Sequence, residues 1–301
     1  MLDIALAREK AQPDEYPVAR NRILRTHFAK RVWRKLFGAQ SWAKRAGTFR
    51  EKEAHGLIQR SNYAYGMLRA ADTAKFFGKS AVTACEFGVA TGMGLINMTQ
   101  LAELIEAETG VKFRVVGFDT GAGLPAPSGY KDHPELWSSG DFSMGDPDLL
   151  RRRLAGKAEL VIGDIKDTIG AFTRTLTTDC PLGFVSIDVD IYSGTVAALQ
   201  GLLGQCEAYL PAISFYLDDV ASYFSNEACG ELCAVDEHNA AYPQRPIYSD
   251  KSLPRGRFEP FADWYRSMYV GHILDHPYRN HARERGSLSL QDHLKFMAAL
   301  R

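Results

Sequence analysis

Hydrophobic runs alternate with polar, glycine-bearing turns from about residue 57 to about residue 220. Each run has the length of a buried strand, and the segments between runs place apolar residues three to four positions apart, as helices do. We expect strands at 81–89, 113–119, 158–162, 183–188 and 212–217. We expect helices at 57–77, 95–109, 149–155, 168–176 and 194–209. Strands that alternate with helices pair in parallel, which predicts an open, mostly parallel twisted α/β sheet with helices on both faces.

The pattern changes on either side of this region. Between residues 20 and 37 apolar residues alternate with basic ones, which predicts an amphipathic basic helix. After residue 220 the chain is less regular, with a helix expected at 228–241 and a strand-like run at 268–274. We therefore divide the chain into a basic helical N-terminal extension, a main domain and a C-terminal tail. These parts cover residues 1–56, 57–280 and 281–301.

Composition narrows the choice of function. Of 301 residues, 46% are hydrophobic and 24% charged, as in globular proteins, and the formal net charge of zero gives no case for nucleic acid. No apolar run approaches the roughly 20 residues that span a bilayer. The first residues carry acids and have no apolar core, so we expect that they are not a secretory signal, and five scattered cysteines without paired spacing favour a reducing cytoplasm.

Basic residues are concentrated in one segment. Residues 20–50 hold ten Lys and Arg and no acid. This segment either contacts a membrane surface or an anionic carrier, or packs on the main domain or on a second subunit. We expect a homo-oligomer.

Acids follow the predicted strands. In an open parallel sheet the carboxyl ends of the strands form one rim, so these acids are expected to converge in space. They are Glu86, Asp119, Asp164, Asp188, Asp190, Asp218 and Asp219.

The turn after the first strand is rich in glycine, at Gly88, Gly92 and Gly94. Its spacing departs from the dinucleotide pattern G-x-G-x-x-G, and Glu86 would repel phosphates. Glu86 suits a cationic amino group instead, such as that of the methionine part of S-adenosylmethionine. Asp119 suits ribose hydroxyls, or caps a turn or helix.

Two further groups of acids remain. Asp164 lies near the adenine amino group or at the N-terminus of the next helix. Asp188, Asp190, Asp218 and Asp219 would repel one another without a positive partner, and hard oxygen ligands suit Mg²⁺. The alternative is that these acids cap turns and fan into solvent. A longer-range candidate is His238, which either reaches the site as a base or lies at the surface.

Several segments together resemble the macrocin O-methyltransferase family, whose members methylate sugar hydroxyls and related groups. The similarity spans about residues 80–245 and rests on EFGVATGMG, GFDTGAGLP, VIGDIKDTI, SIDVDIYSGTVAAL, YLDDV and AVDEH. The chain departs from the family pattern at Gly121, Ala122 and Ser193.

The resemblance implies a Rossmann-like class I methyltransferase that binds S-adenosylmethionine and Mg²⁺. The loop 86–94, including Glu86, Gly88 and Gly92, would bind the methionine portion of the cofactor. Asp119 would bind the ribose and Asp164 would lie by the adenine. The metal ligands would be Asp188, with Asp190 as second choice, together with Asp218 and Asp219.

The expected reaction is transfer of a methyl group to a hydroxyl of a small molecule or sugar. The metal would hold the acceptor oxygen, and Asp188 or Asp190 would take its proton. The glycine-, proline- and serine-rich segment 120–147 is expected to form a lid, with Tyr130, His133 and Trp137 as acceptor contacts. The alternatives are a metal-independent methyltransferase acting on an acid or amine, a nicotinamide-dependent oxidoreductase, and a non-catalytic scaffold.

Overall fold

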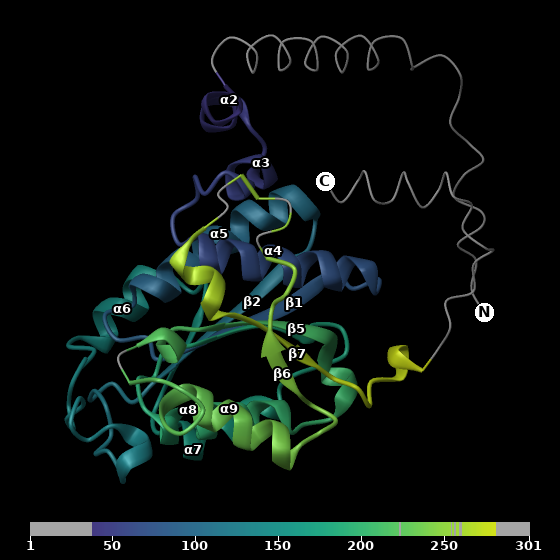
Figure 1. Ribbon diagram of the computed structural model, residues 1–301. Helices are drawn as coiled ribbons and strands as arrows, with labels where there is room; N and C mark the ends of the chain where they lie inside the picture. The colour runs from purple at the N-terminus through teal and green to yellow at the C-terminus, as the bar shows by residue number, and fades with distance from the viewer. Residues whose placement is uncertain (1–37, 223, 254, 256, 259–260, 281–301) are drawn as a thin grey trace, which may run out of the picture.

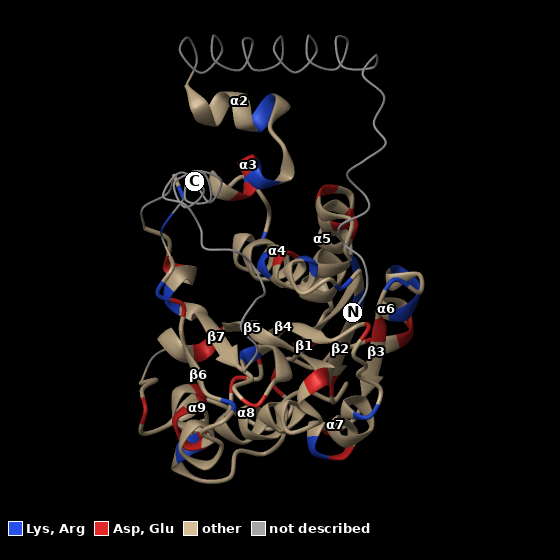
Figure 2. Cartoon of the chain, turned by 90° about the vertical axis from the view of Figure 1, so that its right-hand side faces the viewer, with Lys and Arg blue, Asp and Glu red and all other residues tan. Residues whose placement is uncertain are grey.

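A seven-stranded sheet organises the chain. The computed structural model describes residues 38–280 except 223, 254, 256, 259 and 260. Strand order is β3-β2-β1-β4-β5-β7-β6, as Figure 2 shows edge to edge. The strands are β1 (Ala81–Phe87), β2 (Lys112–Asp119), β3 (Glu159–Ile162), β4 (Leu182–Ile187), β5 (Tyr209–Leu217), β6 (Ile247–Ser249) and β7 (Met268–His272). The first five pair in parallel, and β7 runs antiparallel to both β5 and β6.

Helices cover both faces of the sheet (Figures 1 and 2). One layer contains α4 (Ser61–Phe76), α5 (Met93–Thr109) and α6 (Pro147–Leu154). The other contains α7 (Ile165–Thr173), α8 (Tyr192–Leu199) and α9 (Gly230–Ala241). Two short helices, α2 (Ala39–Ala46) and α3 (Phe49–Ala54), lie beyond the first layer. No helix in the described ranges is long and apolar enough to cross a membrane.

Each face of the sheet has its own hydrophobic core. Phe87, Phe118 and Ile187 pack against α7 and α8, whereas Val82, Val115 and Phe184 pack against α4 and α5. Strand β4 is buried at every position. This explains why its sequence reads as a continuous apolar run rather than as an alternating one.

The order of the strands reverses between β1 and β4. From β1 the chain continues outward to β2 and β3, then returns to β4 and continues to β5 on the other side. Connections that diverge in this way leave a crevice beyond the carboxyl ends of the two central strands, where ligands of open α/β sheets bind. The sheet order, the parallel register and the two helical layers confirm the predicted fold, the Rossmann-like fold of class I methyltransferases.

The predicted helix at 194–209 was wrong beyond Leu199. Two short 3₁₀ turns, Gln200–Leu202 and Cys206–Ala208, follow α8, and β5 begins earlier than expected, at Tyr209. The Tyr209 hydroxyl accepts a hydrogen bond from the Gly204 amide and donates one to the Gly201 carbonyl. Two glycines weaken the helix there, and the buried tyrosine holds the turn that replaces it.

The C-terminal part of the sheet was predicted incompletely. Strand β7 lies within the expected run 268–274, but β6 was missed because it has only three residues and follows Pro246. The helix expected at 57–77 begins at Ser61, and α7 begins at Ile165 because Asp164 caps it.

The N-terminal extension is described only from residue 38 onward. Arg50, one of the basic residues of the 20–50 segment, pairs with Asp72 of α4 and also lies near Glu108 of α5. This arginine packs on the main domain. The amphipathic helix predicted at 20–37 and the tail 281–301 lie outside the described residues. Binding of this segment to a membrane or anionic carrier, and a homo-oligomer, therefore stay predictions.

Candidate active site

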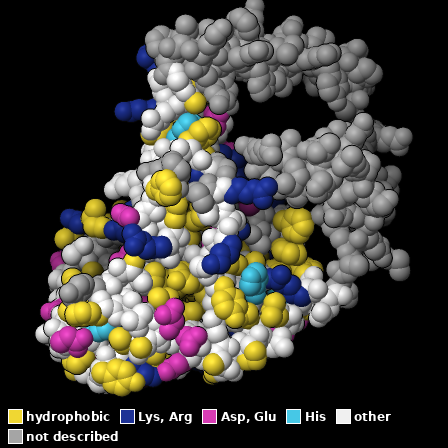
Figure 3. All heavy atoms as spheres, in the orientation of Figure 1, with side chains coloured by type: hydrophobic (Ala, Val, Ile, Leu, Met, Phe, Trp, Pro, Cys, Tyr) yellow, Lys and Arg dark blue, Asp and Glu magenta, His cyan; other side chains and the backbone are white. Residues whose placement is uncertain are grey.

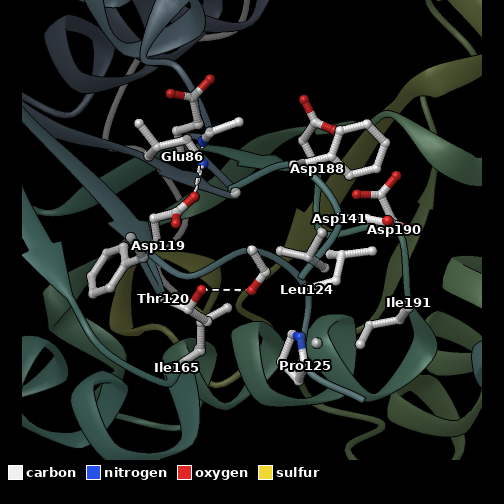
Figure 4. A pocket seen from close by; sticks show the side chains of 18 of the residues that line it. Glu86, Asp119, Thr120, Leu124, Pro125, Asp141, Ile165, Asp188, Asp190 and Ile191 are labelled. Atoms are coloured by element: carbon white, nitrogen blue, oxygen red, sulfur yellow. Dashed lines mark hydrogen bonds between the residues drawn. The ribbon is translucent and has the colours of Figure 1, made fainter. Parts of the chain in front are cut away.

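A cavity of about 430 Å³ opens at the carboxyl ends of β1, β2 and β4 (Figure 4). Most of the predicted site residues line it: Glu86, Gly88, Asp119, Asp164, Asp188, Asp190 and Asp218. The topology thus brings together acids that are up to 132 positions apart in the sequence, from Glu86 to Asp218. Gly92 and Asp219 are not part of the lining.

The glycine loop owes its composition to close packing. At Gly88, with φ +84°, a Cβ would lie 1.6 Å from the Asp188 carbonyl oxygen. At Gly92, with φ +87°, a Cβ would lie 2.2 Å from the Leu150 side chain of α6. A Cβ at Gly94 would lie 1.9 Å from Oε1 of Glu86. Gly88 and Gly94 therefore shape the cavity wall, whereas Gly92 faces α6; a direct contact of Gly92 with a cofactor stays a prediction.

Glu86 is a buried carboxyl with one oxygen unused. Its side chain comes from β1, and Oε1 accepts a hydrogen bond of 2.6 Å from the Tyr63 hydroxyl. Oε2 is buried and has no hydrogen-bond partner among the described residues. Burial raises the pKa of Glu86 to about 7. A cationic group in the cavity would supply the missing donor.

Asp119 ties two strand-end loops together. Its Oδ2 accepts hydrogen bonds from the amides of Val89 and Ala90, at 2.9 and 2.8 Å. Its Oδ1 accepts one from the Gly121 amide at 2.6 Å. A carboxylate oxygen accepts two donors, so Oδ1 keeps capacity for a ligand hydroxyl.

Asp164 lies at the N-terminus of the next helix, which is one of the two alternatives that the sequence left open; a contact with adenine stays a prediction. Its side chain caps α7 by accepting a hydrogen bond of 2.9 Å from the Lys166 amide, and it also lines the cavity. Capping acids are stabilised at a helix N-terminus, so this carboxylate is held in place at the cavity wall.

Asp188 and Asp190, from the loop after β4, and Asp218, from the end of β5, line the same part of the cavity. Figure 4 shows Asp188 and Asp190 on the side of the cavity opposite Asp119. Burial, followed by the charges of Asp218 and Asp219, raises the pKa of Asp188 to about 8. Burial and the charge of Asp219 raise the pKa of Asp190 to about 7. Asp190 also has a left-handed backbone, with φ +60°. Strain of this kind at a non-glycine residue clusters at functional sites.

The Asp219 carboxylate forms hydrogen bonds within the protein and does not line the cavity. Its Oδ2 accepts from the Asp190 amide at 3.1 Å, and its Oδ1 accepts from Ser222 Oγ at 3.0 Å. Its own amide donates to Glu231 Oε2 at 2.9 Å. Glu231, on α9, is fully buried, and burial raises its pKa well above the usual range. The sequence analysis missed Glu231, since no local pattern marks a helix residue that supports a distant loop.

The aspartates carry the oxygen donors of a magnesium site. Mg²⁺ prefers oxygen donors that carry negative charge, and burial, followed by the charges of neighbouring aspartates, raises the pKa values of Asp188, Asp190 and Asp219. Within residues 38–280, apart from the five undescribed positions, no three acidic, histidine or cysteine side chains are arranged to hold a metal ion.

A second, larger cavity of about 1200 Å³ meets the first at Asp218, which lines both. Aromatic side chains of the segment 250–267 form much of its wall, among them Phe261, Trp264 and Tyr265. The Tyr216 hydroxyl, from β5, donates to Asp218 Oδ1. No sequence pattern distinguished this segment, because its aromatic residues lack the spacing of a strand or a helix.

The segment 120–147 walls the first cavity through residues other than those expected. Leu124, Pro125 and Asp141 line it (Figure 4), as do several of their neighbours. Tyr130, His133 and Trp137 line neither of the two cavities. Tyr130 is 72% exposed, so it points into solvent. Acceptor contacts at these three residues are therefore not supported.

His238 does not reach the aspartates. It is a buried residue of α9, its Nε2 lies 3.0 Å from the Arg245 carbonyl oxygen, and it lines neither cavity. Burial lowers its pKa. Both earlier alternatives for this residue, a base in the site and a surface residue, were wrong.

On the face seen in Figure 3, basic side chains are scattered among acidic and hydrophobic ones. Among the residues that are described, this face therefore has no patch of one charge that would mark a binding surface.

Comparison with known proteins gives structural likeness only. No protein-family model and no curated protein matches the sequence. Among solved structures, the calicheamicin methyltransferase CalS11 is 19% identical, with 73% of this chain and 82% of that chain covered and a TM-score of 0.47. The O-methyltransferase NovP is 16% identical, with 70% and 79% covered and a TM-score of 0.49. An O-methyltransferase from Bacillus cereus is 12% identical, with 81% and 96% covered and a TM-score of 0.38. The assignment of the fold rests on strand order and register rather than on these likenesses.

Proposed function

We propose that this protein is an S-adenosylmethionine-dependent O-methyltransferase that acts, with Mg²⁺, on a hydroxyl of a small molecule or sugar. One observation carries the proposal. The cavity at the strand ends is lined by six carboxyls besides Asp164, among them Glu86 and Asp188, and by only two basic side chains, Arg60 and Lys166. A sulfonium with an ammonium group is attracted there, whereas the phosphates of a dinucleotide are repelled.

The donor would lie along the ends of β1, β2 and β3. Its ammonium would take the free oxygen of Glu86, its ribose hydroxyl would donate to Oδ1 of Asp119, and its adenine amino group would lie near Asp164. Each of these oxygens lines the cavity and has capacity for another donor.

The acceptor would approach through the second cavity and meet the donor beside Asp218. Aromatic faces such as that of Trp264 suit the apolar side of a sugar or other ring. In the reaction the acceptor oxygen attacks the methyl carbon, the carbon–sulfur bond breaks with its electron pair going to sulfur, and S-adenosylhomocysteine leaves. Asp188 or Asp190 takes the hydroxyl proton.

The residues that would hold Mg²⁺ are Asp188, Asp218 and Asp219. When bound, the ion would supply positive charge that lowers the pKa of the acceptor hydroxyl. The chain itself contributes the strained Asp190 loop, whose amide donates to Asp219 and so fixes that carboxylate between two strand ends.

A second candidate is a methyltransferase that needs no metal and acts on an acid or an amine. It is favoured by Asp219, whose hydrogen bonds to the Asp190 amide and to Ser222 hold it within the protein, so that it does not line the first cavity. In that protein the raised pKa values would leave Asp188 and Asp190 partly protonated at neutral pH.

Calorimetry separates these candidates. We expect S-adenosylhomocysteine to bind the whole chain, NAD not to bind, and Mg²⁺ to give a second binding event that Asp218→Asn removes and Asp148→Asn on α6 leaves intact. Donor binding without a Mg²⁺ event supports the metal-independent candidate. Binding of NAD in place of S-adenosylhomocysteine refutes both.

A further inference from the structure

The segment 120–147 is attached at its middle to the helices α8 and α9. The 3₁₀ turn Tyr130–Asp132, which belongs to this segment, lies against both helices. The Lys131 ammonium pairs with Glu237 of α9 and lies 4.8 Å from the centre of the Tyr192 ring of α8. The segment that the sequence suggested as a lid is therefore anchored to the main domain at this turn.

Asp132 is the buried residue of this turn, with an exposed fraction of 1%. Its Oδ1 accepts a hydrogen bond of 2.7 Å from the Ser193 amide, in the first turn of α8. Its Oδ2 accepts two hydrogen bonds from Ser128, at 2.7 Å from the amide and at 3.1 Å from the hydroxyl. One buried carboxylate thus joins the lid segment to the start of a helix.

Both partners of Asp132 belong to the wall of the first cavity. Ser128 lines the cavity from the lid segment, and Ser193 lines it from α8. Asp132 itself does not line the cavity, so it lies behind the wall. A side chain in this position does not touch a ligand but holds in place the surface that does.

The start of α8 depends on Asp132 because the helix has no cap of its own. Its N-cap residue, Ile191, has an apolar side chain that cannot accept a hydrogen bond from the first amides of the helix. Ile191 directly follows Asp190, which has a strained backbone and donates its amide proton to Asp219. The loop after β4 is therefore held on one side by Asp219 and on the other side, through Ser193, by Asp132.

We propose that Asp132 is a positioning residue for the donor cavity. It holds the lid segment and the loop that carries Asp188 and Asp190 in the arrangement that binds the methyl donor. This inference rests on the proposed function and adds to it the residue that preforms the site. A ligand that meets an ordered wall binds without the free-energy cost of ordering that wall. Loss of the Asp132 carboxylate should therefore lower the affinity for the donor without removing any direct contact.

Two alanine variants separate positioning from general stability. Asp132→Ala removes the hydrogen bonds to Ser128 and Ser193. Asp146→Ala is the matched control, because Asp146 caps α6 by accepting from the Leu149 amide at 2.8 Å, also belongs to the segment 120–147 and does not line the cavity. Both variants should melt at a lower temperature than the unmodified protein.

Only one of the two variants should bind the donor product more weakly. In calorimetry on the whole chain, well below the melting temperatures, we expect Asp132→Ala to weaken binding of S-adenosylhomocysteine about tenfold or more and Asp146→Ala to stay within about twofold. Asp132→Asn should lie between Asp132→Ala and the unmodified protein. Its amide oxygen can still accept from Ser193 and its amino group can donate to the Ser128 hydroxyl, but the Ser128 amide loses its acceptor.

Hydrogen exchange in the ligand-free protein tests the anchor without any donor. The amides of Ser128 and Ser193 should exchange slowly, and Asp132→Ala should speed both at least about tenfold. Unchanged affinity of Asp132→Ala for S-adenosylhomocysteine would overturn the positioning role, and so would an equal loss of affinity in Asp146→Ala. Failure of the unmodified protein to bind S-adenosylhomocysteine would instead overturn the proposed function, and the exchange rates would then still decide whether Asp132 holds the wall.

Discussion

The buried carboxyl of Glu86 makes the site sensitive to pH. Burial raises its folded pKa to about 7 from the usual 4.5. A carboxyl whose pKa is raised on folding contributes stability that is fully present below the unfolded pKa and is lost as pH rises through the folded pKa. For Glu86 that window runs from about pH 4.5 to 7. Above it, the folded protein must keep a charge in a poorly solvated place.

Replacing Glu86 by Gln removes this charge and keeps an acceptor for Tyr63. We expect Glu86→Gln to raise the melting temperature of the ligand-free protein by a few degrees at pH 8 and to leave it nearly unchanged at pH 5. Calorimetric melts at the two pH values measure this, with Glu103→Gln on the exposed side of α5 as control. An equal shift at both pH values would argue against burial of an ionised Glu86.

Gly88 and Gly110 allow the effect of crowding to be separated from that of backbone conformation. Both have positive φ, +84° and +78°, but only at Gly88 would a Cβ meet another atom, the Asp188 carbonyl oxygen. We expect Gly110→Ala to cost about 1 kcal/mol and Gly88→Ala on the order of 4 kcal/mol or more. Urea unfolding measures both losses, and similar values for the two variants would contradict the close approach of the β1 and β4 loops.

At the scale of elements, a buried ion pair joins α3 to the segment 250–267. The Arg257 guanidinium contacts both the carboxylate and the carbonyl oxygen of Glu53, and it lies 4.9 Å from the centre of the Trp264 ring. The two charged side chains are 3% and 8% exposed. This pair therefore anchors the aromatic wall of the second cavity to the N-terminal helices.

Breaking this pair on one side leaves a buried charge. We expect Arg257→Met to destabilise the protein by about 3–5 kcal/mol and the double variant Arg257→Met with Glu53→Leu to recover much of that loss. Arg50→Met, which removes a half-exposed pair with Asp72, should cost less than about 1 kcal/mol. Chemical unfolding measures all three, and no recovery in the double variant would show that Arg257 acts mainly through its aromatic neighbours.

Secondary-structure elements could be predicted from the sequence where a local pattern of apolar residues alone determines them. β1, β2, β4 and β5 are long apolar runs between turns, and their parallel order follows from the intervening helices. The end of α8 escaped prediction because the side chain of Tyr209, from the next strand, terminates it. β6 is too short to carry a pattern and exists because it pairs with β7.

The residues of the site also divide into those that follow from the order of the strands and those that depend on packing between elements. Glu86, Asp119 and Asp188 were predicted because the ends of parallel strands must meet at one rim. Arg60 and Tyr63 were missed because nothing in the sequence indicates that the start of α4 faces that rim. Contacts between side chains from separate elements follow from packing, which local spacing does not encode.

At the scale of the whole molecule, two cavities lie next to each other. The first lies where the two halves of the sheet diverge, and the second lies over the antiparallel side, near β5 and the segment before β7. Asp218 is common to both. The parallel half would thus carry the donor, while the antiparallel half and its aromatic wall would set the choice of acceptor.

The bonds of Asp119 determine how the loops at this rim move. Because one carboxylate holds the amides of Val89, Ala90 and Gly121, the loops after β1 and β2 should open together rather than separately. We expect the Val89 and Ala90 amides to exchange slowly with deuterated solvent in the ligand-free protein. Asp119→Ala should speed this exchange at least about tenfold and leave amides in the middle of α5 unchanged.

Fast exchange at Val89 and Ala90 in the unmodified protein would indicate that the loop is ordered only by a ligand. If the exchange is slow, the loop is already ordered in the ligand-free protein. The entropic cost of ordering it then belongs to folding, and a nucleoside binds to a preformed site. Its association rate would then be set by diffusion into the cavity, not by waiting for the protein to change shape.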